Sequence, residues 1–249
     1  MCCFSRPVQS VSATNIFARS TENGRQYLVY SMTLRAKEAL ALVLPLPVKP
    51  GSGEKAVMFI DLKGYAEFFA DLSKGFPPPP PMASVTNSLS RGSKLEVVTV
   101  GNFEASFVPT VADFSRLDER FRLPAGTWDK LPGYRSHGFA VFKLKSGSTN
   151  VHPMAFSFPR ANPTELFFPT VHIHDGKVHE KAEFDHVLYC QRGPADLFTL
   201  LDWDESSGHA AAFVQLGKAR DIIDGNEHCY RRTLVGSLPN KDFVLRSAA

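Results

Sequence analysis

The pattern of hydrophobic and polar positions in the first quarter of the chain predicts β-strands. Residues 25–32 are rich in β-formers, and residues 39–46 are a continuous apolar run of strand length. Residues 55–62 form a further run of this kind, and the Pro-Gly-Ser-Gly stretch at 50–53 supplies the turn between the two runs. We therefore expect this part of the chain to contribute successive strands to a sheet.

Hydrophobic residues are spaced as on one face of a helix in only two short stretches of the sequence. In residues 64–72, Tyr65, Phe68 and Leu72 fall on one face of a helix, and residues 111–121 are a second candidate. The other hydrophobic stretches have the length of strands, and a Gly-Asn turn joins the first two of them. These predicted strands cover residues 95–100, 103–108, 138–145, 153–159 and 166–174. The pattern as a whole predicts an α+β fold, mainly an antiparallel β-sheet with few short helices.

A proline-rich stretch at residues 73–94 interrupts this pattern. It holds five consecutive prolines, residues 77–81, followed by sequence rich in serine, asparagine and glycine. A run of prolines is stiff and extended, and it lacks the N–H groups that the interior of a sheet needs. We therefore expect an exposed loop within a single domain that spans residues 1–249. The alternative is a docking segment for a partner that recognises proline-rich sequence.

Composition and charge narrow the range of partners. Hydrophobic residues make up 43% of the 249 residues, so the chain can build a core without a structural metal or disulfides. The formal charge is +3 and the basic residues form no stripe, so we expect no nucleic-acid partner. The longest apolar run, residues 39–48, is broken by prolines and too short to span a membrane. Without a signal-peptide pattern, we expect a cytoplasmic protein that does not bind membranes.

Several common catalytic motifs are missing from the sequence. It has no P-loop, no Gly-x-Gly-x-x-Gly fingerprint, no Gly-x-Ser-x-Gly elbow and no Cys-x-x-Cys pair. Their absence disfavours ATP, nicotinamide and serine-hydrolase chemistry. The candidate chemistry therefore rests on histidines and on the cysteines at the N-terminus.

A histidine-rich segment at residues 170–179 is the first candidate site. Asp175-Gly176 between β-formers is a strong signal for a two-residue hairpin turn, which would place His172 opposite His179. His172 and His174 share a face because side chains alternate along a strand. Three imidazoles on one face would suit a transition metal. The alternative is a solvent-facing hairpin that happens to carry three histidines.

Further ligands could complete such a metal site. His186 follows Asp185, a carboxylate that could orient its ring, while His137 opens a predicted strand and Cys3 could add a thiolate. Imidazole with thiolate favours copper first and zinc second. The leading hypothesis is a soluble metalloprotein with a mononuclear histidine site, with an oxidoreductase as the favoured activity; metal-assisted hydrolysis and simple metal binding remain open.

Cys2 supports a different hypothesis. Removal of Met1 would leave Cys2 with a free α-amine, which could activate its thiol as a nucleophile. The Met-Cys start resembles the cysteine amidotransferases and amidases with an N-terminal nucleophile, which implies an amidohydrolase with Cys2 as its catalytic residue. The elements that build their oxyanion hole and amide pocket are not found downstream. Small buried thiols on an N-terminal strand are the other interpretation.

A second resemblance covers the N-terminal fifth of the chain. Cys2-Cys3, the Leu-Val-Tyr stretch at 28–30 and the apolar run ending in Pro-x-Pro at 41–47 are similar to uncharacterised bacterial proteins with these features. This resemblance implies a β-rich fold and no function. A non-catalytic interaction protein is therefore the third class of function that stays open, beside the metalloprotein and the amidohydrolase.

Overall fold

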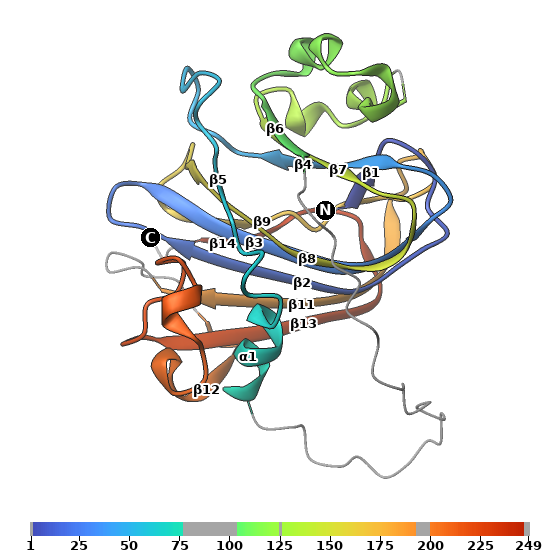
Figure 1. The fold of residues 1–249 in the computed structure, drawn as a ribbon. Helices are drawn as coiled ribbons and strands as arrows, with labels where there is room; N and C mark the ends of the chain where they lie inside the picture. The colour runs from blue at the N-terminus through green and yellow to red at the C-terminus, as the bar shows by residue number, and fades with distance from the viewer. Residues whose placement is uncertain (1, 77–103, 125, 193–199, 247–249) are drawn as a thin grey trace.

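Strands dominate the computed structural model, which describes residues 2–76, 104–124, 126–192 and 200–246 (Figure 1). The strands are β1 (Cys2–Phe4), β2 (Ser10–Ser20), β3 (Arg25–Ala36), β4 (Leu40–Leu46), β5 (Met58–Ile60), β6 (Glu104–Val108), β7 (Gly138–Leu144), β8 (Gly147–Pro159), β9 (Glu165–Phe168), β10 (His172–Ile173), β11 (Lys181–Gln191), β12 (Asp204–His209), β13 (His228–Pro239) and β14 (Phe243–Arg246). The α-helix of the described residues is α1 (Phe68–Lys74), and short 3-10 helices cover Val111–Arg116, Glu119–Phe121, Trp128–Lys130, Pro132–Tyr134, Ala210–Ala212 and Leu216–Lys218.

Two large sheets organise these strands. The seven-stranded sheet has the order β12-β13-β11-β2-β3-β8-β5, and the five-stranded sheet has the order β10-β1-β4-β7-β6. The strand pair β14-β9 forms a small third sheet. Within the described strands, β2 with β11 and β1 with β10 pair in parallel, and the other pairs are antiparallel. Both parallel pairs join segments that lie far apart in the sequence.

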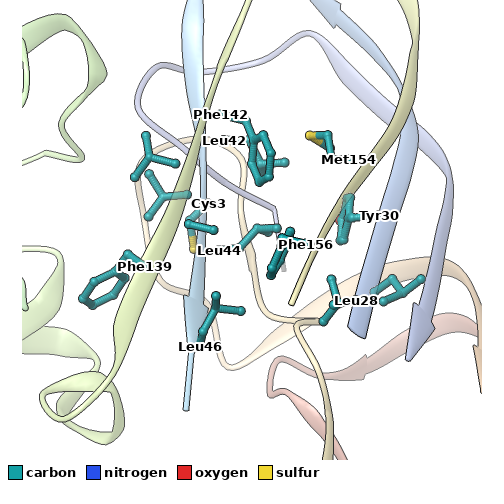
Figure 2. Packing of buried hydrophobic residues seen from close by; sticks show 14 of the residues in the cluster. Cys3, Leu28, Tyr30, Leu42, Leu44, Leu46, Phe139, Phe142, Met154 and Phe156 are labelled. Carbon is teal, nitrogen blue, oxygen red and sulfur yellow. The ribbon is translucent and has the colours of Figure 1, made fainter. Parts of the chain in front are cut away.

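The main hydrophobic core lies between the two large sheets. Figure 2 shows side chains of β4 and β7, such as Leu44 and Phe142, facing side chains of β3 and β8, such as Tyr30 and Phe156. Every residue of β4 is buried, because the 3-10 segments pack over its sheet from the other side, where Phe114 and Trp128 contact Phe139. Burial on both faces explains why the sequence of β4 is a continuous apolar run rather than an alternating one.

Helix α1 covers the other face of the seven-stranded sheet. Phe68 packs edge-on against Phe17 of β2 with ring centroids 5.8 Å apart, within a second hydrophobic cluster. Two hydrogen bonds to Asp71 tie the helix to neighbouring segments. The Tyr65 hydroxyl donates to the Asp71 carboxylate (2.8 Å), and the Gln215 side chain donates to the same carboxylate (2.9 Å). Phe76, just after α1, is buried in the same hydrophobic cluster.

The fold class predicted from the sequence is wrong in its helical part. The described residues form a mainly β protein rather than an α+β one, because their α-helix has only seven residues. The helix predicted at 64–72 begins later, at Phe68, and the one predicted at 111–121 is two 3-10 turns separated by Asp118, whose carboxylate caps the second. Short aromatic-rich stretches gain little from helix propensity alone, so packing decides their backbone.

Several predicted strands are confirmed, whereas the one predicted at 55–62 is only the three-residue β5. Strands β3, β4, β6 and β7 cover the residues expected at 25–32, 39–46, 103–108 and 138–145. The strand expected at 166–174 is instead two short strands, β9 and β10. Residues 77–94 of the predicted loop and the strand predicted at 95–100 lie outside the described residues. No helix in the described ranges is long and apolar enough to cross a membrane.

Candidate functional site

The N-terminal strand β1 inserts between β4 and β10 at the edge of the five-stranded sheet. It pairs antiparallel with β4, where Cys3 lies opposite Val43, and parallel with β10, where Cys2 lies opposite His172 and Cys3 opposite Ile173. Cys3 is fully buried in the main core, among the side chains of Figure 2. It therefore packs in the core as a small side chain.

Three histidines gather beside this strand, and we call His172, His174 and His186 the histidine cluster. The Nε2 atoms of His172 and His186 lie 3.1 Å apart, and the rings of His172 and His174 stack with centroids 4.8 Å apart. Phe184 stacks on the other side of the cluster, 4.4 Å from the His172 ring centroid. Because two facing nitrogens at this distance share one proton, the His172–His186 pair is a hydrogen bond between neutral imidazoles.

Burial keeps these imidazoles neutral. Desolvation, followed by the nearby His186, lowers the pKa of His172 to about 2. Desolvation lowers the pKa of His174 to about 4 and also lowers the pKa of His186, which the neighbouring carboxylate of Asp185 only partly opposes. The cluster is thus an uncharged aromatic and imidazole stack, not a set of groups ready to exchange protons near neutral pH.

The turn after β13 holds the segment that carries His172. The side chain of Asn240 accepts a hydrogen bond from the His172 backbone N–H (2.7 Å) and donates to the carbonyls of His172 and His179 (2.9 Å each). Asp242 accepts from the backbone N–H groups of Thr170 (2.8 Å) and Val171 (3.0 Å). These two side chains supply the partners that a neighbouring strand would otherwise provide.

Tyr134 fixes Asp242 from the opposite side. Its hydroxyl donates to the Asp242 carboxylate at 2.6 Å, and burial raises the pKa of that carboxyl. Asn240, Asp242 and Tyr134 were not predicted as site residues from the sequence. The only sequence signal for the first two is the turn composition Pro-Asn-Lys-Asp at 239–242, which predicts a turn but not its contacts.

The predicted histidine hairpin does not form, and this corrects the expected register. His172 pairs with Cys2 of β1 and not with His179. His179 is exposed, and its Nε2 lies 3.0 Å from the carboxylate of Asp175. Asp175 also accepts a bond from the Lys177 N–H (2.9 Å), so the Asp-Gly pair closes a tight local turn without a strand on its far side.

His137 belongs to a different part of the molecule from the histidine cluster. It precedes β7 and packs against Tyr134 and Phe167, with ring centroids 5.1 and 6.3 Å away. The sequence-predicted set therefore divides: His172, His174 and His186 come together, Cys3 is core, and His179 and His137 have other neighbours.

The metalloprotein hypothesis is contradicted by this arrangement. Within the residues that the structure describes, no group of three or more His, Cys, Asp or Glu side chains could hold a metal ion. The reason is geometric, because the nitrogens of His172 and His186 point at each other and the ring of His174 stacks face-on. The leading hypothesis of a metal-dependent oxidoreductase is corrected accordingly, while copper or zinc as a bound ion stays an untested prediction.

Replacing Asn240 with alanine is expected to lower the free energy of unfolding by about 1–3 kcal/mol, because the buried N–H of His172 loses its acceptor. The measurement is urea unfolding of the two proteins. The matched control is Asn226→Ala, an exposed asparagine in another turn, which should change stability by about 0.5 kcal/mol or less. Equal effects of the two substitutions would show that Asn240 does not hold this segment.

Comparison with known proteins identifies the fold. No family model matches the sequence. The crystal structure of baculovirus P35 matches with a TM-score of 0.53 and 12% sequence identity, over 96% of this chain and 97% of P35. A mutated baculovirus P35 after caspase cleavage matches with a TM-score of 0.50 and 12% identity, over 95% of this chain and 100% of that one. The chain therefore has the fold of P35, almost from end to end.

The likeness to P35 concerns the fold, whereas the oxidoreductase hypothesis is corrected by the lack of a metal-holding group among the described residues. The role of Cys2 as a nucleophile stays a prediction. The structure places Cys2 in β1 beside His172, and the neutral, mutually hydrogen-bonded imidazoles there are poor general bases.

Proposed function

We propose that this protein is a non-catalytic protein that binds a protease. The observation that carries the proposal is the likeness to P35 over nearly the full length of both chains. One of the matching structures is P35 after cleavage by a caspase, so P35 is a protein on which a protease acts. A shared architecture of this extent makes the same class of partner the leading candidate for this chain.

The segment between α1 and β6 is the contact that we propose for the protease. Its start is fixed by the Gly75 carbonyl, which accepts from the Ser207 N–H (2.8 Å), and by the Arg231 guanidinium 4.6 Å above the Phe76 ring. Its end enters β6, which pairs with β7 in the other large sheet. Figure 1 shows α1 and β6 on opposite sides of the two-sheet stack. The segment therefore joins two anchored points of a rigid scaffold.

The sequence of this segment limits which protease could cleave it. Residues 77–103 contain Arg91 and Lys94 as basic residues and Glu96 as the acidic one, and they contain no aspartate. A protease selects its cleavage site through the side chain that enters its specificity pocket, and a pocket with a buried carboxylate accepts basic side chains. Arg91 and Lys94 thus favour a protease with an acidic pocket. The stretch 193–199, which holds Asp196, is the competing contact.

The test measures binding to immobilised, catalytically inactive proteases: a caspase, a papain-like cysteine protease and a trypsin-like serine protease. We expect the wild-type chain to bind at least one of them. Replacing residues 77–81 by a Gly/Ser stretch of equal length should weaken that binding at least tenfold, because a stiff proline run loses little entropy on binding and a flexible one loses more.

The control is the same replacement at residues 193–197. Both stretches lie outside the described strands, so neither change removes a residue of the described core. Binding that is unaffected by the first replacement and lost with the second would move the contact to residues 193–199. No binding by the wild-type chain to any of the three proteases would contradict the proposed function.

A further inference from the structure

A pocket of about 340 Å³ opens at one end of the five-stranded sheet. Its walls come from three separate segments: residues 48–53 after β4, residues 107–110 at the end of β6, and residues 135–138 before β7. None of the residues of the histidine cluster lines it.

The charges around the pocket are all of one sign. Lys49 and Arg135 line it, and no aspartate or glutamate does. Neither cation pairs with a carboxylate in the part of the chain that the structure describes. The nearby Glu54 is already held by Arg116 at 2.5 Å. Two cations without counter-ions at one concave surface create a favourable potential for an anion.

His137 adds a polar atom without a partner. It lines the pocket, and among the described residues its buried Nδ1 has no hydrogen-bond partner. Burial lowers the pKa of His137 to about 4, so the ring is neutral at physiological pH and its Nδ1 can carry a proton to donate. A buried polar atom without a partner costs free energy and therefore calls for an explanation. A bound acceptor would satisfy it.

The rest of the wall is apolar and has a defined shape. Val48, Phe107 and Pro109 contribute the apolar surface. The Phe107 ring lies where it does because residue 138 is glycine: a Cβ at that position would meet the ring at 2.6 Å. The opposite rim contains Gly51 and Gly53, whose φ angles of +77° and +73° favour glycine. The pocket thus combines an aromatic wall with a cationic rim.

We propose that this pocket binds a small anion with an apolar or aromatic body, such as an aromatic carboxylate or phosphate monoester. The anionic group is held by Arg135 and Lys49 and accepts a hydrogen bond from Nδ1 of His137. The apolar body lies against Phe107, Val48 and Pro109. A guanidinium suits both carboxylate and phosphate because its N–H groups match two oxygens at once.

The test is a titration of the protein with benzoate, phenyl phosphate and benzyl alcohol, followed by NMR of ring-labelled histidines. Benzoate and phenyl phosphate distinguish the two anionic groups, and benzyl alcohol has the same body without the charge. At least one anion is expected to shift the His137 signals saturably and to raise the His137 pKa. The exposed His179 should respond to neither anion, and benzyl alcohol should bind at least tenfold more weakly than the better anion.

Variants locate the binding. Arg135→Ala and Lys49→Ala are each expected to weaken the better anion roughly 10- to 100-fold, as expected for loss of a charge-assisted contact. Lys130→Ala removes an exposed cation that does not line the pocket and should leave binding unchanged. Equal binding of benzyl alcohol, equal losses in all three variants, or no saturable shift of His137 would each overturn the proposal.

Discussion

Replacing Phe156 with alanine is expected to lower the free energy of unfolding by about 3–5 kcal/mol, the largest effect that we predict for any single substitution. Phe156 of β8 is fully buried between the two large sheets. Its ring centroid lies 5.8 Å from that of Phe142 on the facing sheet and 6.3 Å from that of Phe158. Alanine would leave a cavity that strands fixed on both sides cannot close.

The control for this prediction is Phe59→Ala at the rim of the same aromatic cluster. Phe59 is 39% exposed, although its ring also contacts Phe142 and Phe156. Because part of that side chain is already in water, we expect a loss of about 1–2 kcal/mol. Chemical denaturation of both variants gives the comparison. Equal losses would mean that the two sheets do not share the tightly packed core that defines the fold.

Lowering the pH from 6.5 to 4.5 is expected to lower the free energy of unfolding by about 3–8 kcal/mol. Each histidine whose folded-state pKa is depressed contributes up to about 1.4 kcal/mol per pH unit. The folded-state pKa is about 2 for His172 and about 4 for His174 and His137, below the usual histidine value. The unfolded chain therefore binds more protons as the pH falls below about 6.5, and the stability from these groups is lost toward their folded pKa values. Asp242, whose pKa is raised, acts in the opposite direction in this window.

A pair of matched variants isolates the contribution of one histidine. His174→Phe keeps a ring between Phe4 and His172 but removes a titrating group, so the slope of stability against pH should fall by about 1.4 kcal/mol per pH unit. Val235→Phe, which adds a ring at an exposed position and removes no titrating group, should leave the slope unchanged. Urea unfolding at four pH values between 4.5 and 6.5 measures the slopes. Identical slopes in both variants would rule out a buried, neutral His174.

The strands that could be predicted are those whose own residues, by apolar content or β-propensity, favour a strand. β4 is apolar throughout because both its faces are covered, and β3 is rich in β-formers. β2 and β13 were missed. Their outward positions carry serine, threonine and arginine, and their pairing with β11 is a long-range choice that no local pattern specifies. The predicted helices failed for a related reason, because aromatic packing and not helix propensity sets their backbone.

At the candidate site, the arrangement of neighbouring residues could be predicted, but their contacts with distant segments could not. The alternation rule correctly places His172 and His174 together. It could not supply their partners, because the strand beside His172 begins at Cys2 and the side chain that satisfies its backbone comes from Asn240. The Asp-Gly pair does form a turn. The register inferred from that turn was wrong because a two-stranded hairpin was assumed where β1 and Asn240 provide the pairing.

The proposed function is tested most directly by mixing the intact protein with each protease of the panel and following two quantities. These are the residual activity of the protease on a peptide substrate and the intact mass of this chain. We expect at least one protease to lose activity at a one-to-one ratio while the chain is cut once, between residues 77 and 103. Full protease activity with an uncut chain, or cutting at many places without loss of activity, would contradict it.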